Sequence, residues 1–468
     1  MNPIEKIAPA APYGITPALL EKYDRPGPRY TSYPTAPEWK EDFKFSDYEE
    51  KLAEAGRKTE EPLSLYMHIP FCEARCWFCG CNVTITHKED AAETYLDFVE
   101  IETARTAELL GPRKKVVQLH WGGGTPTYLA PDQLARLFSV LTSHFEILPE
   151  AEVGIEVDPR VTTFEQMKLL KQLGFNRLSM GVQDFDPQVQ EAVHRVQPFQ
   201  QTKALFDFAR EIGFASINID LIYGLPYQSP ESFRQTVKQA CAFRPDRLAV
   251  YAYAHVPWLK AHQKLIPEAA LPKKADKLAL FITAAEELCA AGYLQIGMDH
   301  FALPQDELAK ALFDRQLHRN FMGYTTMPEA DLIGLGVSAI GDLCGAYAQN
   351  EVKINAYYSA VAKNRLAAHR GYRLDADDLA RRWLIRSIMC LFSVSFSALK
   401  ENFGIDYAGY FAPEDGQLDH FIDDGFLVRR PDGLEVTPLG RFFVRNIAMT
   451  FDRYLRQPKE KPVFSRTI

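Results

Sequence analysis

The sequence predicts an α/β protein whose main domain is a partial barrel of six parallel strands, an incomplete form of the eight-stranded barrel. From residue 63, six short apolar segments alternate with helical segments, which is the pattern of repeated strand–helix units. In folds of this kind the chemistry lies at the carboxyl ends of the strands. Here those ends carry the cysteines of one loop, a glycine run, Glu156, Gln183, Asp220 and Ala254.

The predicted strands are separated by segments with helix signals. Residues 91–110 are predicted as a helix that stops at Gly111. Thr163 and Gln166 form a capping box for a later helix, and Pro230 suits the first turn of another. The strands are predicted at residues 63–69, 116–120, 153–157, 177–182, 217–221 and 248–255.

Three parts are predicted along the chain. Residues 1–60 are rich in proline, which removes backbone donors and fixes φ, so an extended segment is expected there. Residues 61–320 form the partial barrel. Residues 321–468 are predicted as a smaller, mainly helical domain with a hairpin at 427–436, turned at Asp432-Gly433, which suggests a winged-helix shape.

The bulk composition disfavours several classes of function. The chain has 468 residues and a formal net charge of −8 without a long basic run, which argues against generic nucleic-acid binding. No apolar run approaches the ~20 residues of a membrane helix, and no signal peptide is predicted. We therefore expect a soluble, cytoplasmic monomer whose cysteines are reduced.

The densest chemical signal is the loop after the first predicted strand. Cys72, Cys76, Cys79 and Cys81 have the spacing C-x3-C-x2-C-x-C, and Pro70 ends the strand before them. Short spacing lets three thiolates reach one iron–sulfur cluster. Three ligands on a four-iron cluster leave one iron open, and an open position distinguishes a reactive metal site from a structural one. Cys72, Cys76 and Cys79 are the predicted ligands, and the role of Cys81 stays open.

Three other interpretations suit this loop less well. A structural zinc site usually takes four sulfurs as two separated pairs, and no second pair follows in this chain. A disulfide framework is not expected in a long chain without a secretory signal. Unconnected buried thiols rarely crowd into one polar loop.

The residues around the cysteines carry a family resemblance. The C-x3-C-x2-C loop after a strand resembles the radical S-adenosylmethionine (SAM) enzymes. The longer strings YMHIPFC, at 66–72, and CGCN, at 79–82, resemble the oxygen-independent coproporphyrinogen III oxidases (dehydrogenases) of haem biosynthesis. Strings at 27–35, 297–301, 317–326, 381–390 and 440–446 extend this resemblance over most of the chain. It implies a partial (β/α)6 barrel of the radical SAM type, a 4Fe–4S cluster and two molecules of SAM.

The resemblance also implies roles for residues near the strand ends. A first SAM would contact the adenine-side Tyr66, the glycine motif at Gly123 and Gly124, the ribose-binding Glu156, and Ile340. Positions matching a second SAM site are Phe78, Gly124, Thr125, Gln183, Arg195 and Asp220, and Ala254 is expected to line the same region. From the residues alone, Glu156 could instead be a solvated strand end and Arg195 a surface charge.

The implied reaction is the oxidative decarboxylation of two propionates of coproporphyrinogen III to vinyl groups, giving protoporphyrinogen IX. The substrate carries four carboxylates, so local positive charge is expected around it, with Arg29, Arg195, His300 and Arg319 as candidates. Further expected partners are an electron donor such as a flavodoxin or ferredoxin, and an electron acceptor that the sequence does not identify. The alternatives are a related radical SAM enzyme that modifies haem, and a haem chaperone on the same scaffold.

Overall fold

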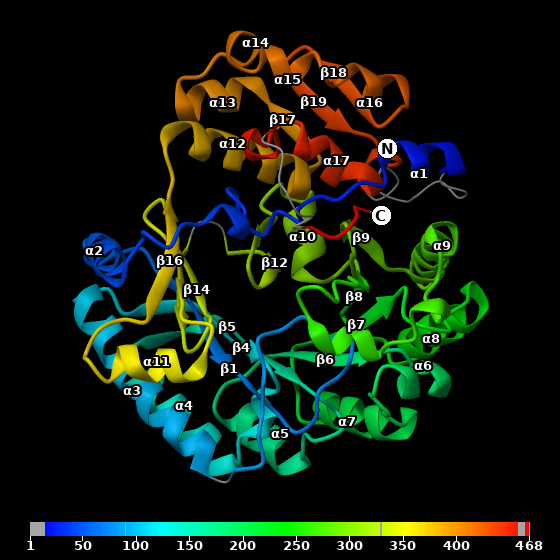
Figure 1. Ribbon diagram of the computed structural model, residues 1–468. Helices are drawn as coiled ribbons and strands as arrows, with labels where there is room; N and C mark the ends of the chain where they lie inside the picture. The colour runs from blue at the N-terminus through cyan, green and yellow to red at the C-terminus, as the bar shows by residue number, and fades with distance from the viewer. Residues whose placement is uncertain (1–14, 89, 328–329, 457–463, 468) are drawn as a thin grey trace.

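Figure 1 shows the computed structural model, which describes residues 15–88, 90–327, 330–456 and 464–467. A curved sheet with its helices forms the lower part of the molecule in this view, and a mainly helical domain lies above it. The N-terminal segment, drawn in blue, runs between these two parts. The layout matches the predicted fold class.

The six predicted strands form the centre of one sheet, as parallel neighbours in chain order. Both faces of β1 are largely buried, as expected where helices and barrel contents cover a parallel sheet. The strands are β1 (Leu63–Ile69), β4 (Lys115–Gly123), β5 (Glu146–Val157), β6 (Arg177–Gln183), β7 (Ser216–Tyr223) and β8 (Arg247–Ala252).

The sixth strand is shorter than predicted. We expected it to run through residue 255, but β8 ends at Ala252. The side chain of Gln263 donates to the carbonyl of Ala254 at 3.1 Å and accepts from the N–H of Val256 at 2.6 Å. These backbone groups are therefore satisfied by a side chain and not by a neighbouring strand.

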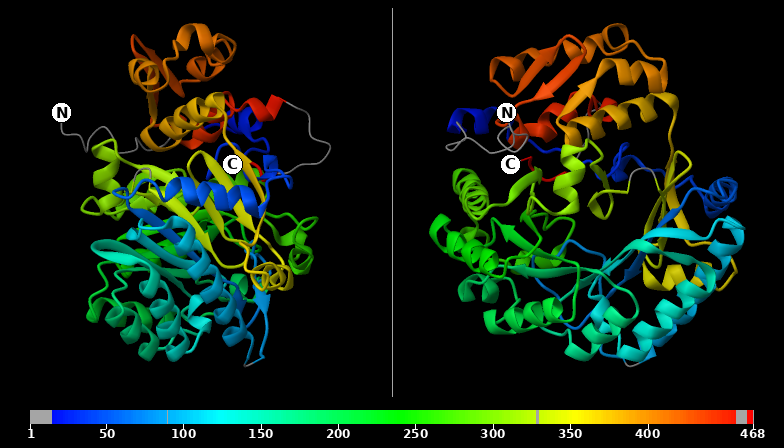
Figure 2. Two further views of the ribbon diagram at one scale, coloured as in Figure 1. Left: turned by 90° about the vertical axis from the view of Figure 1, so that its left-hand side faces the viewer. Right: turned by 180° about the vertical axis from the view of Figure 1, so that it is seen from behind.

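Helices lie along the outer side of the curved sheet (Figures 1 and 2). The capping box of Thr163 and Gln166 is present at the start of α5, as predicted. The helices are α3 (Asp90–Leu110), α4 (Pro131–His144), α5 (Phe164–Gln172), α6 (Pro187–Ala192), α7 (Phe199–Glu211), α8 (Pro230–Ala242) and α9 (Lys274–Ala290).

Six further strands extend the sheet to twelve. Parallel to β1 lies β13 (Asp331–Leu335), followed by the antiparallel β14 (Ile340–Leu343), β15 (Ala346–Asn350) and β16 (Ala368–Arg373). The other edge carries β10 (His300–Ala302) and β9 (Leu294–Gly297). Because the sheet continues past residue 320, we propose that its domain ends near residue 373.

Shorter elements complete this part of the chain. They are α1 (Pro17–Tyr23), α2 (Phe45–Ala55), α10 (Glu307–Phe313) and α11 (Ile354–Val361), with the hairpin β11 (His318–Asn320) and β12 (Gly323–Thr325). In the cysteine loop, β2 (Phe71–Cys72) pairs with β3 (Thr84–Ile85).

The C-terminal domain packs helices against a three-stranded sheet of order β17-β19-β18, and β18 with β19 forms the predicted hairpin. The hairpin turn lies one residue earlier than predicted, because Gly433 pairs with Arg430 within the ladder. A Cβ on Gly433 would lie 2.1 Å from the carbonyl oxygen of Val394. The elements are α12 (Ala376–Arg386), β17 (Ser393–Ser395), α13 (Phe396–Phe403), α14 (Tyr407–Tyr410), α15 (Ala412–Asp415), α16 (Asp419–Asp423), β18 (Leu427–Arg430), β19 (Gly433–Val436) and α17 (Val444–Met449).

Buried polar contacts join the N-terminal segment to the C-terminal domain. Arg445 of α17 donates to the carbonyl of Pro28 at 3.0 Å, and the hydroxyl of Tyr30 donates to Asp452 at 3.0 Å.

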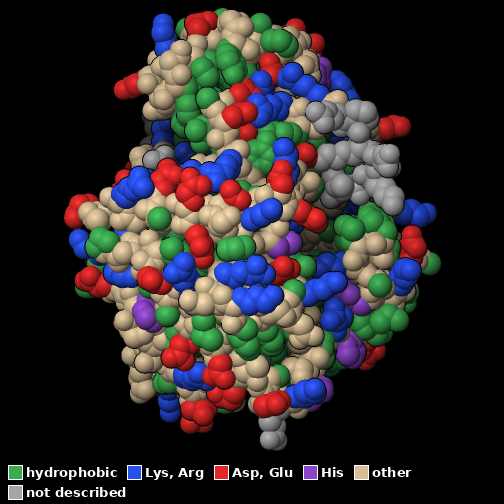
Figure 3. All heavy atoms as spheres, turned by 60° about the vertical axis from the view of Figure 1, so that its left-hand side comes forward, with side chains coloured by type: hydrophobic (Ala, Val, Ile, Leu, Met, Phe, Trp, Pro, Cys, Tyr) green, Lys and Arg blue, Asp and Glu red, His purple; other side chains and the backbone are tan. Residues whose placement is uncertain are grey.

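On the face of the molecule shown in Figure 3, acidic and basic side chains are interspersed. Within the described ranges, no helix combines the length and apolar character needed to cross a membrane.

Candidate cofactor site

The cysteine loop joins the end of β1 to the start of α3, at the carboxyl edge of the sheet. Cys76 is buried, Cys72 and Cys79 are partly exposed, and Cys81 is exposed. In the described part of the chain, no three His, Cys, Asp or Glu side chains converge closely enough to hold a single metal ion. A four-iron cluster is wider than one ion, and each thiolate would bind a different iron, so the loop suits a cluster.

Two arginines lie against Cys76. Arg160 and Arg195 each place a guanidinium nitrogen 3.5 Å from its sulfur. Both also pair with Asp158, at 2.7 and 3.0 Å. Two cations and one carboxylate leave a positive balance beside the cysteine, which favours the thiolate that a cluster requires. Arg195 is only 7% exposed, so the alternative of a surface charge is wrong.

Other contacts tune the remaining cysteines. The hydroxyl of Thr125 lies 3.4 Å from the sulfur of Cys72. Burial raises the pKa of the Cys72 thiol to about 11, so this cysteine depends on a metal to become a thiolate. A hydrogen bond from the thiol of Cys81 lowers the pKa of Cys79. The neighbouring Cys81 thus favours the thiolate form of Cys79.

The glycine run packs directly on the cysteine loop. Gly123 has a φ of +114°, and its N–H donates to Glu156 at 3.1 Å. A Cβ on Gly124 would lie 2.6 Å from the carbonyl oxygen of Phe71. Glycine is therefore required at Gly123 by conformation and at Gly124 by close approach. Because of this contact, Gly124 positions the cysteine loop.

A cavity of about 590 Å³ opens beside the loop. It brings together four residues predicted to contact the first SAM, from β1, the end of β4, the end of β5 and the start of β14: Tyr66, Gly123, Glu156 and Ile340. Its lining also includes His68, Gly80, Cys81, Asn82, His120 and Lys260. Its size and mixed lining are those of a small-molecule site.

Polar contacts fix the orientation of groups in this cavity. The hydroxyl of Tyr66 lies 3.0 Å from Nδ1 of His68, and its ring stacks on that of His120. Burial raises the pKa of Glu156, but the His120 side chain and the Gly123 N–H outweigh it, so the pKa is lowered. Glu156 is therefore a carboxylate held at the end of β5 and able to accept hydroxyl hydrogen bonds. Its side chain is 45% exposed, so it also meets solvent, as the alternative of a solvated strand end expects.

The residues predicted for a second SAM lie in two groups nearby. Gln183 and Arg195 both approach Gly181, where a built Cβ would meet their side chains at 2.8 and 3.1 Å. The Oε1 atom of Gln183 is buried without a partner among the described residues, which suits contact with a ligand. Phe78 and Ala254 are brought together by Gln263, whose side chain donates to both carbonyls at 3.1 Å.

Asp220 lines a second, interior cavity of about 140 Å³ that also touches Glu156. Its carboxylate accepts from Asn218 at 2.8 Å and Ser179 at 3.1 Å. Burial raises its pKa to about 6. This residue can therefore change protonation state near neutral pH.

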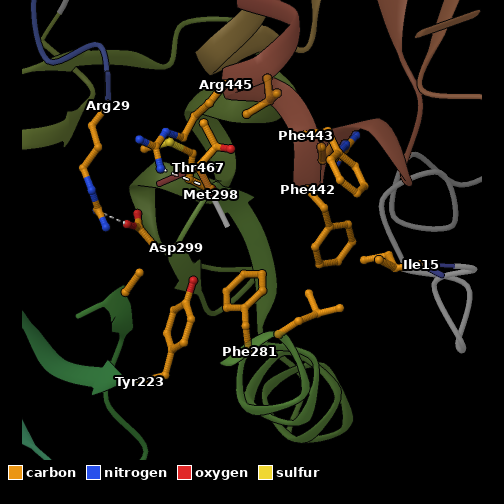
Figure 4. Close-up of a pocket in the computed structure, with 14 residues that line it drawn as sticks. Ile15, Arg29, Tyr223, Phe281, Met298, Asp299, Phe442, Phe443, Arg445 and Thr467 are labelled. Atoms are coloured by element: carbon orange, nitrogen blue, oxygen red, sulfur yellow. Dashed lines mark hydrogen bonds and ion pairs between the residues drawn. The ribbon is translucent and has the colours of Figure 1, made fainter. Parts of the chain in front are cut away.

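Three of the four predicted cationic residues gather around Asp299. Arg29 of the N-terminal segment points to Asp299 and pairs with it at 2.6 Å (Figure 4). The other oxygen of Asp299 lies 2.8 Å from Nδ1 of His300, whose ring faces Tyr251. Arg319 lies over the ring of Tyr324, with two buried nitrogens lacking partners among described residues. Arg195, in contrast, contacts Cys76 of the cysteine loop.

Several residues at the site were missed in the sequence. His68 lies two residues after the predicted Tyr66 in β1, and so on the same face of the strand, which was a usable signal. Arg160 lies three residues after the end of β5, so its place at the carboxyl edge of the sheet could have been recognised. His262 and Gln263 lie in a long segment after β8, and nothing in their local sequence indicates that they hold the cysteine loop.

The fold and the site define a radical SAM protein. Residues 66–240 match the radical SAM superfamily, and residues 374–443 match the HemN C-terminal domain. The chain is 45% identical to an oxygen-independent coproporphyrinogen III oxidase of Synechocystis sp., over 96% of this chain and 97% of that protein. It is 47% identical to the enzyme of that name from Escherichia coli K12, over 96% and 98%.

A solved structure agrees. Escherichia coli coproporphyrinogen III oxidase (HemN), described as a radical SAM enzyme, matches with a TM-score of 0.88 and 46% identity, over 91% of this chain and 97% of that one. The chain belongs to the family of oxygen-independent coproporphyrinogen III oxidases.

Proposed function

We propose that this protein decarboxylates two propionate side chains of coproporphyrinogen III oxidatively, without oxygen, and so makes protoporphyrinogen IX. The observation that carries the proposal is a 590 Å³ cavity lined by the end of the cysteine loop, Gly80 to Asn82, in a chain of this family. The strand ends of a partial barrel supply both features.

Cys72, Cys76 and Cys79 would hold a 4Fe–4S cluster, and one iron would remain open for SAM. When bound, the cluster and SAM would supply the radical chemistry that removes a hydrogen atom from a propionate β-carbon. The chain's part is to hold these groups, exclude water and orient the substrate. Arg160 and Arg195 would offset the negative charge of the cluster ligands.

Residues of the large cavity would bind the first SAM. Glu156, an ionised carboxylate, would accept hydrogen bonds from ribose hydroxyls, and the ring of Tyr66 would cover the adenine side. Gly123 and Ile340 line the same space. We propose a second SAM beside Gln183, whose buried Oε1 atom needs a donor, with Phe78, Thr125, Arg195, Asp220 and Ala254 around it.

Arg29, His300 and Arg319 would meet the substrate. Arg319 has buried donors without partners among the described residues, which is costly unless a ligand satisfies them. A propionate carboxylate fits such a guanidinium in a bidentate manner. We further propose a monomer in the cytoplasm that takes its electron from a flavodoxin or ferredoxin.

The decisive experiment is anaerobic incubation of the cluster-reconstituted protein with SAM, dithionite and coproporphyrinogen III. The proposal expects protoporphyrinogen, with methionine and 5′-deoxyadenosine. Tight haem binding with no product would support a haem chaperone, and modification of added haem would support the haem-modifying alternative. Bound zinc with no iron would refute the cluster assignment.

Arg319→Leu tests the carboxylate contact. We expect KM for coproporphyrinogen to rise about tenfold or more, because a charge-assisted pair is worth about 1.5–3 kcal/mol. SAM cleavage in the absence of substrate should be unchanged. Arg315→Leu, on the exposed surface of the same region, is the control, and equal KM values for both variants would remove Arg319 from the substrate site.

A further inference from the structure

An apolar and basic surface lies next to the cysteine loop, on the segment that follows β8. Trp258, Leu259 and Leu265 are 58%, 64% and 58% exposed, which is unusual for side chains of this size. Lys264 lies exposed among them. We call these four residues the carrier face.

The charge of this segment differs from that of the whole chain. Residues 255–267 contain two lysines and two histidines but no Asp or Glu, although the chain as a whole carries a net charge of −8. Arg75, in the cysteine loop, and Lys260 add positive potential near Cys79. A partner with acidic side chains would be attracted to this place.

Hydrogen bonds attach the segment to the cysteine loop. His262 contacts the carbonyl of Cys79 at 2.8 Å, Lys260 donates to the carbonyl of Cys81 at 3.2 Å, and Gln263 donates to that of Phe78 at 3.1 Å. The segment that bears the carrier face is thus hydrogen-bonded directly to the backbone of the predicted ligand Cys79. His262 provides a continuous path of bonds from this segment to the backbone of that cysteine.

A second partly apolar patch lies at the cysteine loop itself. Trp77 stacks on His194, with ring centroids 5.4 Å apart, and Val196 beside them is 61% exposed. His194 contacts the carbonyl of Arg75 at 3.0 Å. Exposed apolar side chains therefore occur on the segment after β8 and again near Trp77, and both places are in contact with the cysteine loop.

We propose that the carrier face is the docking site of a small acidic flavoprotein of the flavodoxin class, which delivers the electron for SAM cleavage. This inference rests on the proposed function. One electron leaves the reduced flavin and enters the oxidised cluster, so the carrier is oxidised by one electron and the cluster is reduced by one. No bond of this chain forms or breaks.

A flavin fits this face better than a phosphate-rich or hydrophilic partner. The edge of a bound flavin exposed to a partner is an apolar ring, which suits Trp258, Leu259 and Leu265. Acidic side chains around that ring would pair with Lys264 and Arg75. Trp is enriched among the residues that dominate binding energy, so Trp258 is the expected centre of the contact.

The test uses the full, cluster-reconstituted chain and purified flavodoxin. The variants are Lys264→Glu and the double variant Trp258→Ser with Leu259→Ser. Lys363→Glu and Leu379→Ser, exposed on other surfaces, are the matched controls. Three quantities are measured: the Kd of flavodoxin, the rate of cluster reduction by reduced flavodoxin, and the rate of cluster reduction by dithionite.

We expect the carrier-face variants to raise the Kd about tenfold and to slow reduction by flavodoxin to match. Their reduction by dithionite should equal that of the wild type, and the controls should be unchanged in every measurement. Unchanged flavodoxin binding would overturn the proposal, as would an equal loss with dithionite. Reduction by an acidic ferredoxin but not by flavodoxin would overturn the choice of a flavin.

The same experiment separates this inference from the proposed function. If flavodoxin reduces the wild-type cluster and the variants weaken that step, the docking site stands even when no protoporphyrinogen forms. If dithionite supports protoporphyrinogen formation while flavodoxin binds elsewhere, the proposed function stands and the docking site is refuted.

Discussion

Replacement of Gly124 by alanine tests whether the glycine run positions the cysteine loop. A Cβ there would lie 2.6 Å from the oxygen of Phe71, 2.7 Å from the carbonyl carbon of Pro70 and 2.8 Å from its oxygen. All three are backbone atoms, which cannot rotate away. The end of β1 must therefore move by several tenths of an ångström, at a cost of about 3 kcal/mol, the upper end of overpacking effects.

That movement would carry Cys72, which directly follows Phe71, away from its position beside Thr125. We expect Gly124→Ala to lower the first unfolding transition and to bind less than half the wild-type iron after anaerobic reconstitution. Thermal unfolding and iron and sulfide analysis measure the two effects. Gly409→Ala is the control, since its Cβ would find the nearest atom at 3.5 Å. Wild-type stability and iron content in Gly124→Ala would refute the reasoning.

Three further predictions concern charge and the cysteines. Arg113→Met should lower the free energy of unfolding by about 3–5 kcal/mol in chemical denaturation, because it removes the buried ion pair with Asp331 of β13. Arg105→Met, which removes the pair with the exposed Glu108, should lower it by under about 0.5 kcal/mol. Burial raises the pKa of Asp220 to about 6, so its protonated form should add roughly 2–3 kcal/mol to the free energy of unfolding below about pH 4, and this contribution should be lost as the pH rises through 6. Asp220→Asn should therefore reduce the dependence of the unfolding free energy on pH in urea titrations, and an unchanged dependence would contradict the prediction. Cys79→Ser should lose the cluster while Cys81→Ser retains it, as iron analysis would show, and equal loss in both would make Cys81 a ligand.

The central sheet could be predicted because its signals are local. Alternating apolar residues along β1 and short apolar runs bounded by turns mark each strand, and parallel order follows from the helices between them. The cysteine spacing is equally local. Gly123, Glu156 and Asp220, all predicted at the carboxyl ends of strands, line the two cavities, because topology decides the edge at which a strand ends.

Features that depend on distant pairing could not be predicted in this way. The strands β13 to β16 are short, and their place beside β1 is decided by contacts across more than two hundred residues. Likewise, the ion pair between Asp158 and Arg195 forms only when folding brings the two residues together, so the sequence gives no sign of it. A polar residue at a strand end looks the same in the sequence whether it meets solvent or a buried partner.

The cysteines are close in sequence, but the groups that hold them come from separate strand ends. Thr125 follows β4 and contacts Cys72, Asp158 follows β5 and orients the arginines at Cys76, and His262 lies beyond β8 and contacts the backbone of Cys79. Each thiolate environment therefore exists only when the corresponding part of the sheet is paired. Tight cluster binding should consequently require the folded barrel, and a peptide that contains the cysteine loop alone lacks the groups that favour its thiolates.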